Sequence, residues 1–206
     1  MKQQLNLFKF INYNIKGTTI KTLKYIDLFC GAGGFSLGFD KSGFHNIFSV
    51  DIEENFCKTY KTNFPTHTLI QKDISQITEN EIKELIGSNE VDVIIGGPPC
   101  QGFSIAGKIG RKFIDDPRNR LFKEFVRIVS VVNPKYFVME NVARLYTHNN
   151  HKTREEITKD FNKLGYEVTN LAIPGGSNSR IFRLAVTESI LNKYDIVFCA
   201  WTDIAR

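Results

Sequence analysis

One cysteine of this chain stands on a segment that can continue neither as a strand nor as a helix. Cys100 lies in the segment 96–102, GGPPCQG, whose prolines and glycines disrupt both kinds of structure. A thiol on such a rigid loop suits a nucleophile, because a thiolate attacks only when it is held in line with its target. The usual fate of a lone cysteine is burial in a core, which we expect for Cys30, Cys57 and Cys199. For Cys100, we favour nucleophilic attack.

The surroundings of Cys100 argue against two familiar kinds of cysteine enzyme. No His lies close in sequence to activate the thiol as in a protease. Ala106 stands where the phosphatase pattern has an Arg. Glu140 follows an apolar run at 136–139, so an acid is expected at the same sheet edge as the thiol. A thiol with a carboxyl group suits attack on an electron-poor ring assisted by proton donation; without the cysteine, Glu140 would be interpreted as an exposed acid at a strand end.

A glycine-rich turn occupies residues 30–36, CGAGGFS, directly after an apolar run. Its glycines let the backbone turn sharply and bring N–H groups close to a nucleotide-like cofactor, although a tight strand-to-helix turn without a ligand has the same composition. A dinucleotide fingerprint would need a glycine where Ser36 stands, which disfavours NAD.

Two acids follow the next two apolar runs. Asp51 comes about twenty residues after the glycines, where a carboxylate can accept hydrogen bonds from both ribose hydroxyls. Asp73 is placed to accept from an adenine amino group. Each also suits a helix cap or a turn, and for Asp51 both roles can hold together.

Alternating strand and helix patterns must position these residues. Short β-branched and aromatic runs alternate with apolar residues at three- and four-residue spacing, which is typical of an α/β fold with a mostly parallel sheet. Ligands of such sheets bind beyond the carboxyl ends of the strands, where the residues above lie. We expect strands at 25–29, 46–50, 68–70 (the only one polar enough for an edge), 91–95 and 136–139, and helices at 53–63, 78–86, 120–132 and 153–164.

Composition narrows the setting. The 206 residues suit one compact domain, with a net charge of +5 that would suit a polyanionic partner. The four cysteines have neither paired spacing nor disulfide-scaffold density, and no apolar stretch is long enough to span a membrane. We therefore expect a cytoplasmic protein without membrane contact or metal ion.

Taken in order, these motifs resemble those of a known family. The segment 27–34 (DLFCGAGG), the acids at 51 and 73, and the segments 99–101 (PCQ) and 140–142 (ENV) are similar to the motif series of the S-adenosylmethionine-dependent DNA (cytosine-5) methyltransferases. The resemblance covers residues 24–172 and implies their Rossmann-like fold. It implies double-stranded DNA as substrate and a bacterial restriction-modification system with a restriction endonuclease counterpart.

The resemblance also implies roles for individual residues. Cys100 would add to C6 of a cytosine swung out of the duplex, and Glu140 would hold the base while C5 takes the methyl group. S-adenosylmethionine would lie across Phe29, Gly31 and Gly33, with Asp51 at the ribose and Asp73 at the adenine; Pro99, Gln101 and Asn141 would contact the substrate.

The resemblance fades near Ile173. The family's Gln-Arg-x-Arg motif is not matched by Arg180 and Arg183, and there is no room for a target-recognition region. We expect an extension over 1–23 and an incomplete catalytic domain over 24–206, from a truncated or frameshifted gene or one half of a split enzyme with a complementing C-terminal chain. Two alternatives stay open: an RNA cytosine-5 methyltransferase and an inactive remnant.

Overall fold

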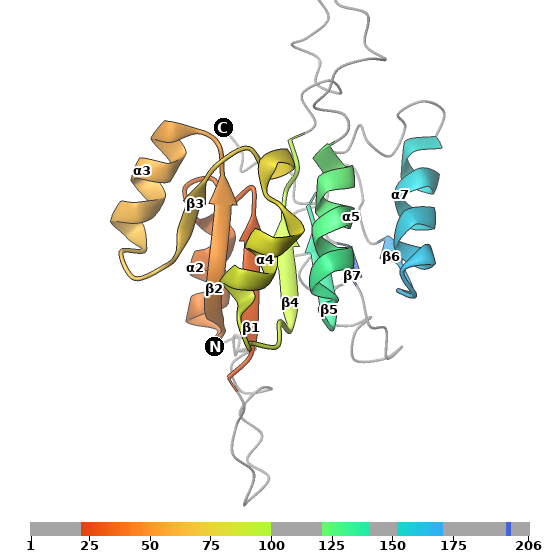
Figure 1. The fold of residues 1–206 in the computed structure, drawn as a ribbon, viewed down its shortest axis with the longest axis horizontal. Helices are drawn as coiled ribbons and strands as arrows, with labels where there is room; N and C mark the ends of the chain where they lie inside the picture. Colours follow the sequence, from red (N-terminus) through yellow and green to blue (C-terminus); the bar gives the residue numbers. More distant parts are fainter. Residues whose placement is uncertain (1–21, 100–120, 141–151, 171–196, 199–206) are drawn as a thin grey trace, which may run out of the picture.

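The computed structural model describes residues 22–99, 121–140, 152–170 and 197–198. In these residues a five-stranded parallel sheet is covered by helices on both faces, and two short strands form a separate parallel pair (Figure 1). In chain order the elements are β1 (Lys24–Leu28), α2 (Gly34–Lys41), β2 (His45–Asp51), α3 (Glu54–Asn63), β3 (Leu69–Gln71), the 3₁₀ helix η1 (Ile74–Gln76), α4 (Glu79–Ile86), β4 (Val93–Gly96), α5 (Leu121–Val132), β5 (Tyr136–Met139), α7 (Lys152–Lys163), β6 (Thr169–Asn170) and β7 (Val197–Phe198).

The chain builds the sheet outward from β1 in two directions. The strand order is β3-β2-β1-β4-β5, with all neighbours parallel. Leu28 at the end of β1 is level with Val50 of β2 and Gly96 of β4, and Gly96 is level with Met139 of β5. The carboxyl ends therefore share one edge, and the order reverses beside β1, which is where such sheets bind ligands.

Alternate residues of β1 face different surroundings. Ile26 and Leu28 join the large apolar core, to which α4, α5 and α7 contribute side chains such as Phe125 and Phe161. The opposite face carries α2 and α3, and here Asp27 is fully buried. The two faces therefore differ in chemistry: one is apolar, and the other includes a carboxyl group at the centre of the sheet.

Local sequence signals set the ends of α4. The Thr78 hydroxyl accepts from the Glu81 N–H, and the Glu81 carboxylate accepts from the Thr78 N–H, which forms a capping box. Gly87 ends the helix with a φ of 57°. This helix packs against α5.

The expected elements are confirmed within two residues at each end, and the third strand lies at a sheet edge as predicted. The fifth strand was expected to be too apolar for a solvated edge; β5 ends the five-strand order and contacts β7. Helix α2 was not predicted, because Gly34, Ser36 and Gly38 are poor helix formers. Within the described residues, no helix is long and apolar enough to cross a membrane.

Candidate nucleotide-cofactor site at the sheet edge

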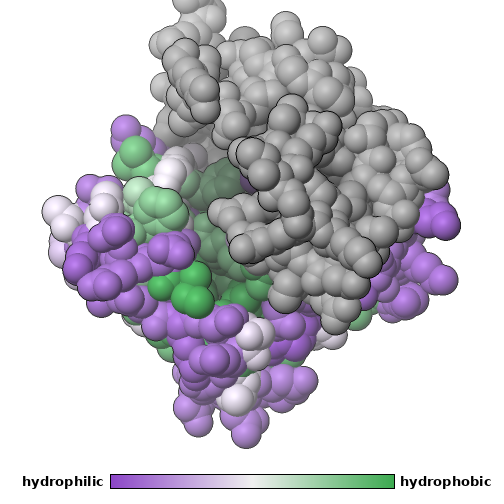
Figure 2. All heavy atoms as spheres, turned by 90° about the horizontal axis from the view of Figure 1, so that it is seen from above, coloured by the Kyte–Doolittle hydropathy of each residue, from purple (hydrophilic) through white to green (hydrophobic). Residues whose placement is uncertain are grey.

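A cavity of about 670 Å³ opens at the carboxyl edge of the sheet. Figure 2, which shows the molecule from above the view of Figure 1, has apolar residues gathered in a hollow with hydrophilic residues to the left of it and below it. The lining comes from the strand ends, the segments after them and the start of α5: Phe29, Gly31, Val50, Asp51, Ile52, Glu53, Phe56, Lys72, Asp73, Ile74, Ser75, Gly97, Pro99, Leu121 and Glu124.

The turn between β1 and α2 has an unusual backbone. Phe29, Gly31 and Gly33 have φ values of 59°, 55° and 95°, in the left-handed region that favours glycine. Phe29 and Gly31 line the cavity, but Gly33 does not. A Cβ atom on Gly33 would lie 2.2 Å from the ring of Phe64, the residue that follows α3. Because glycine has no Cβ, the turn can pack closely against this ring. The structure therefore separates the three predicted cofactor residues of the turn into two that face the cavity and one that packs behind it.

Asp51 fixes the turn from the neighbouring strand. One carboxylate oxygen accepts from the Gly31 N–H at 2.8 Å, and the other accepts from the Glu53 N–H at 2.9 Å. The N-cap of α3 is Glu53, whose own side chain makes no capping bond. Asp51 therefore satisfies a donor at the start of the helix without being its N-cap. Because a carboxylate has about four acceptor positions, it retains acceptor capacity toward the cavity that it lines.

Asp73 also lines the cavity and has a local structural role. Its Oδ1 accepts from the Ser75 N–H at 2.9 Å and from the Ser75 hydroxyl at 2.8 Å, which caps η1. The capping alternative raised from the sequence is therefore present. It leaves the second carboxylate oxygen for other donors.

Apolar side chains of the cavity were missed by the sequence reasoning. Ile52 and Phe56 are 59% and 51% exposed, which is high for large apolar residues, and Ile74 lies on η1. Two carboxylates beside an aromatic and two aliphatic side chains suit a nucleoside, with polar sugar edges and a flat base. The available signal was the four-residue spacing of Ile52 and Phe56 directly after an acid.

The other side of the edge carries Glu140 and the start of the cysteine loop. The Glu140 N–H donates to the Gly96 carbonyl at 2.8 Å. A Cβ atom on Gly97 would lie 2.9 Å from Glu140 Oε2, so this carboxyl group lies directly against the backbone of the loop. Pro99 lines the cavity, whereas Cys100, Gln101 and Asn141 lie outside the described residues.

The cysteines that the structure describes are buried. Cys30 and Cys57 are 5% and 0% exposed and carry free thiols. Burial raises the pKa of each thiol, and nearby carboxylates, Asp27 and Asp51 for Cys30 and Asp51 for Cys57, raise it further. The prediction that these two are structural is confirmed, whereas Cys199 lies outside the described residues.

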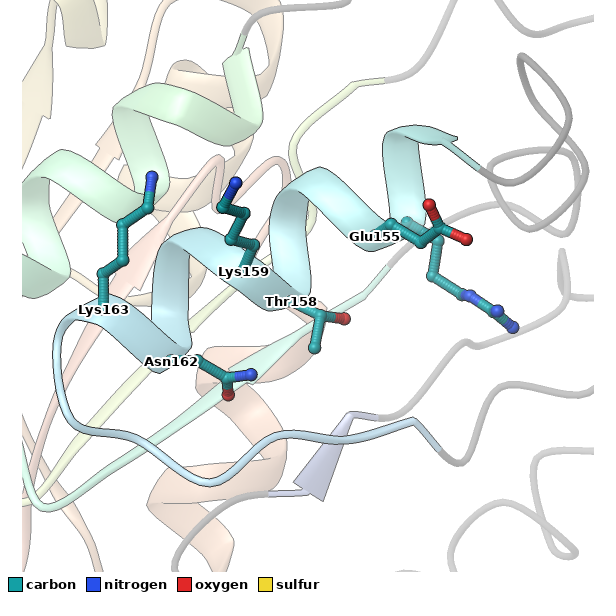
Figure 3. A pocket seen from close by; sticks show the side chains of 6 residues that line it. Glu155, Thr158, Lys159, Asn162 and Lys163 are labelled. Atoms are coloured by element: carbon teal, nitrogen blue, oxygen red, sulfur yellow. The ribbon is translucent and has the colours of Figure 1, made fainter.

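A second cavity, of about 660 Å³, lies along α7 and lacks convergent chemistry. All six lining residues belong to this helix, and Figure 3 shows Lys159 and Lys163 projecting to one side while Thr158 and Asn162 project to the other. No strand end contributes to it. Among the described residues, no three His, Cys, Asp or Glu side chains form a group suited to a metal ion. The cavity at the sheet edge is therefore the candidate site.

A parallel sheet with a glycine-rich turn after β1 and an acid at the carboxyl end of β2 defines the class of nucleotide-cofactor-binding α/β proteins. Within this class, the profile of the C-5 cytosine-specific DNA methylase family matches residues 23–174. The chain belongs to that family.

Curated relatives agree with this assignment. The chain is 62% identical over 147 residues to the type II methyltransferase M1.HphI of Haemophilus parahaemolyticus, which covers 71% of this chain and 40% of that protein. It is 38% identical over 174 residues to the type II methyltransferase M.AquIA of a Picosynechococcus strain, with coverage of 84% and 65%. The chain thus spans less than two thirds of the length of these relatives.

Solved structures show the same fold. A putative DNA modification methyltransferase encoded within an Escherichia coli prophage matches with a TM-score of 0.59 and 36% identity, over 69% of this chain and 38% of that one. A Spodoptera frugiperda DNMT2 mutant matches with a TM-score of 0.51 and 30% identity, over 68% and 42%. The fold is the Rossmann-like fold of S-adenosylmethionine-dependent methyltransferases, as predicted.

Proposed function

We propose that this chain carries the cofactor-binding and nucleophile-bearing part of a DNA (cytosine-5) methyltransferase, which transfers a methyl group from S-adenosylmethionine to C5 of cytosine. One observation carries the proposal. A single sheet edge gathers the glycine-rich turn, two acids and the start of the cysteine loop around one cavity, and Glu140 lies directly against Gly97 of the cavity wall. Family membership makes cytosine in DNA the substrate to test first.

The described lining fits S-adenosylmethionine, which supplies an electrophilic methyl group when bound. Asp51 would accept from the ribose hydroxyls with the capacity left after its two backbone bonds. Asp73 would accept from the adenine amino group through the oxygen not used in capping η1. Ile52, Phe56 and Ile74 offer apolar surface for the adenine ring.

The chemistry would be carried by Cys100 and Glu140. The Cys100 thiolate adds to C6 of a cytosine swung out of the duplex, which makes C5 a carbon nucleophile. Glu140 holds the base through N3 and the amino group and stabilises the charge that develops. C5 then takes the methyl group. Loss of the C5 proton breaks the Cys100–C6 bond and restores the thiolate.

A complete enzyme needs more chain than the portion that matches. This portion corresponds to 40% of M1.HphI, so the rest of the family's length has to be supplied, either by the same polypeptide or by a complementing chain. We propose double-stranded DNA as the partner of the assembled enzyme. A restriction endonuclease of matching specificity would be its genetic counterpart, since the curated relatives are type II methyltransferases.

Covalent trapping tests this function. DNA bearing 5-fluorocytosine blocks the final elimination, so an active enzyme stays joined to it when S-adenosylmethionine is present. We expect a shifted band with the chain supplemented by the C-terminal portion of M1.HphI, and none with Cys100→Ser. Cys57→Ser is the matched control, because that thiol is buried. Trapping that survives Cys100→Ser would remove this residue from its role, and no trapping with the supplemented wild type would favour the inactive remnant.

A further inference from the structure

A short 3₁₀ helix supplies part of the cavity wall. Asp73, Ile74 and Ser75 all line the cavity, the first as the N-cap of η1 and the other two within it. The helix has only three residues, and the bond that closes its C-terminal end, from the Ile77 N–H to the Ile74 carbonyl, is 3.3 Å long. Hydrogen-bond geometry in such helices is poor. The position of η1 in the wall therefore depends on its contacts with other elements.

Apolar contacts hold η1 against the core but do not orient it. Ile74 and Ile77 are 4% and 2% exposed, and both join the large apolar core. Hydrophobic contact is not directional, so it leaves the rotation of a three-residue helix undetermined. The places of Asp73 and Ser75 in the cavity wall depend on that rotation. A directional bond from a rigid neighbour fixes it.

Arg127 of α5 makes such a bond. Its Nη2 donates to the Ile74 carbonyl oxygen at 2.9 Å, across 53 residues of sequence. Its Nε donates to Glu124 Oε2 at 2.7 Å. The guanidinium is a planar, rigid fork, so the bond to Glu124 aims the second donor at η1. Glu124 lines the cavity, whereas Arg127 is not among its lining residues, so the arginine acts on the cavity through the groups that it holds.

The helix α5 is a rigid reference for this bond. It contacts η1, and it is anchored in the core by four buried side chains: Phe122, Phe125, Ile128 and Val129. Leu121 and Glu124, both in its first turn, line the cavity. The guanidinium of Arg127 therefore ties two parts of the cavity wall, the start of α5 and η1, to each other.

A helix-surface ion pair alone does not account for this arginine. A pair with Glu124 three residues earlier needs one donor, and a lysine would serve it. The bond to the Ile74 carbonyl needs a second donor in a fixed direction, which arginine supplies and lysine does not. Lys123 of the same helix shows the simpler case, because it pairs with Glu156 of α7 and does not line the cavity.

We propose that Arg127 is a positioning residue for the nucleoside part of the cofactor, because it holds η1 in place against α5. The proposal rests on the proposed function, in which Asp73 contacts the adenine. Without the two guanidinium bonds η1 shifts, so Asp73 and Ser75 no longer lie where the nucleoside meets them. Cofactor affinity then falls, although no residue that lines the cavity has been replaced.

Amide hydrogen exchange in the full chain, followed by NMR without cofactor, tests the hold on η1. In Arg127→Met, the N–H groups of Ser75 and Ile77, which bond within η1 and its cap, should exchange about two- to tenfold faster, the range for one net hydrogen bond. The Gly87 N–H at the end of α4 is the internal reference and should keep its rate. Unchanged exchange at Ser75 and Ile77 relative to Gly87 would overturn the hold.

Two further variants make the exchange measurement specific. Lys123→Met is the matched control, because it removes an ion pair of the same helix that does not reach η1, and exchange in η1 should stay as in the wild type. Arg127→Lys replaces Arg127→Met if the latter does not fold. Its ammonium can pair with Glu124 but lacks the fixed fork, so exchange in η1 should still rise.

Calorimetric titration tests the effect on binding. S-adenosylhomocysteine is the probe, because it has the nucleoside of the cofactor without the sulfonium charge and responds little to a changed charge near the cavity. Arg127→Met should weaken its binding by about two- to tenfold, and Lys123→Met should leave it unchanged. Equal affinity of Arg127→Met and wild type would overturn the positioning role. Absence of binding by the wild type would count against the proposed function instead, and amide exchange would still decide whether Arg127 holds η1.

Double variants separate positioning through η1 from a general loss of structure. In an Asp73→Ala background η1 has lost its cap, so Arg127→Met should weaken binding by a smaller factor than in the wild type. In an Asp51→Ala background it should keep its full factor, because Asp51 holds the turn after β1 and the start of α3. A full factor with Asp73→Ala, or a reduced factor with Asp51→Ala, would overturn positioning through η1.

Discussion

Replacing Gly33 with Ala should disrupt the cofactor turn more than any other glycine substitution in it. Gly33 has a φ of 95°, and an added Cβ would meet Phe64 ring atoms at 2.2, 2.9 and 3.1 Å. Gly31 also has a positive φ, of 55°, but nothing lies within 4 Å of its Cβ position. The two positions therefore separate backbone strain from steric collision.

The expected losses of unfolding free energy follow from backbone strain and steric collision. A left-handed conformation costs an L-residue about 1–2 kcal/mol, which applies to both substitutions. Overpacking adds about 1–3 kcal/mol at Gly33 alone. We expect Gly33→Ala to lower the free energy of unfolding by about 2–5 kcal/mol and Gly31→Ala by about 1–2 kcal/mol.

Urea unfolding followed by circular dichroism measures both changes. Gly38→Ala in α2 is the matched control, because its Cβ meets nothing within 4 Å and the helix should gain about 0.5–1 kcal/mol. Adding Phe64→Ala to Gly33→Ala removes the collision, so the double variant should cost less than the sum of its parts. The steric argument would be refuted if Gly33→Ala and Gly31→Ala lowered the free energy of unfolding equally. It would also be refuted if the losses of Gly33→Ala and Phe64→Ala were fully additive.

Three further predictions concern acids of the turn and its surroundings. Asp51→Ala should weaken binding of S-adenosylmethionine by about 1.5–3 kcal/mol in calorimetry, through loss of charge-assisted hydrogen bonds; unchanged affinity would leave Asp51 only its backbone bonds. Asp73→Asn should keep the melting temperature, because the amide oxygen can still cap η1, while Asp73→Ala should lower it. Asp27 holds its proton to about pH 7 in the fold, against 3.8 for the unfolded side chain, so its stabilising contribution is complete below about pH 4 and is lost as pH rises through 7. Urea unfolding at pH 5 and pH 8 should show this loss in the wild type but not in Asp27→Asn.

The sequence predicted most of the fold because its strands are short, apolar and bounded by turn residues. Parallel strands buried on both faces have few other ways to satisfy their backbone groups, so these runs are reliable signals. Helix α2 was missed because its helical state depends on packing against β1 and β2 and not on its own glycine-rich sequence. Its Phe35 and Phe39 contact the core cluster of Tyr25.

The candidate site could be predicted in part for a related reason. Chemistry-bearing residues directly after strands are brought to one edge by the topology alone, which placed Asp51, Asp73 and Glu140 there. Apolar lining residues such as Phe56 have only the spacing after Asp51 as a signal, and core residues of a helix show the same spacing. Their role depends on exposure, which only the folded structure gives.

The backbone hydrogen bonds of Asp51 and its proposed contact with the cofactor belong to one arrangement and do not exclude each other. A carboxylate free to rotate would lose conformational entropy on binding a ribose, and that loss would weaken the complex. The Gly31 and Glu53 N–H groups hold the two oxygens of Asp51 at 2.8 and 2.9 Å before any ligand binds. The side chain therefore loses this conformational entropy when the protein folds and not when the ligand binds. The same bonds tie β2 to the turn after β1, and the acid that holds the turn in shape is also the one oriented for the ligand.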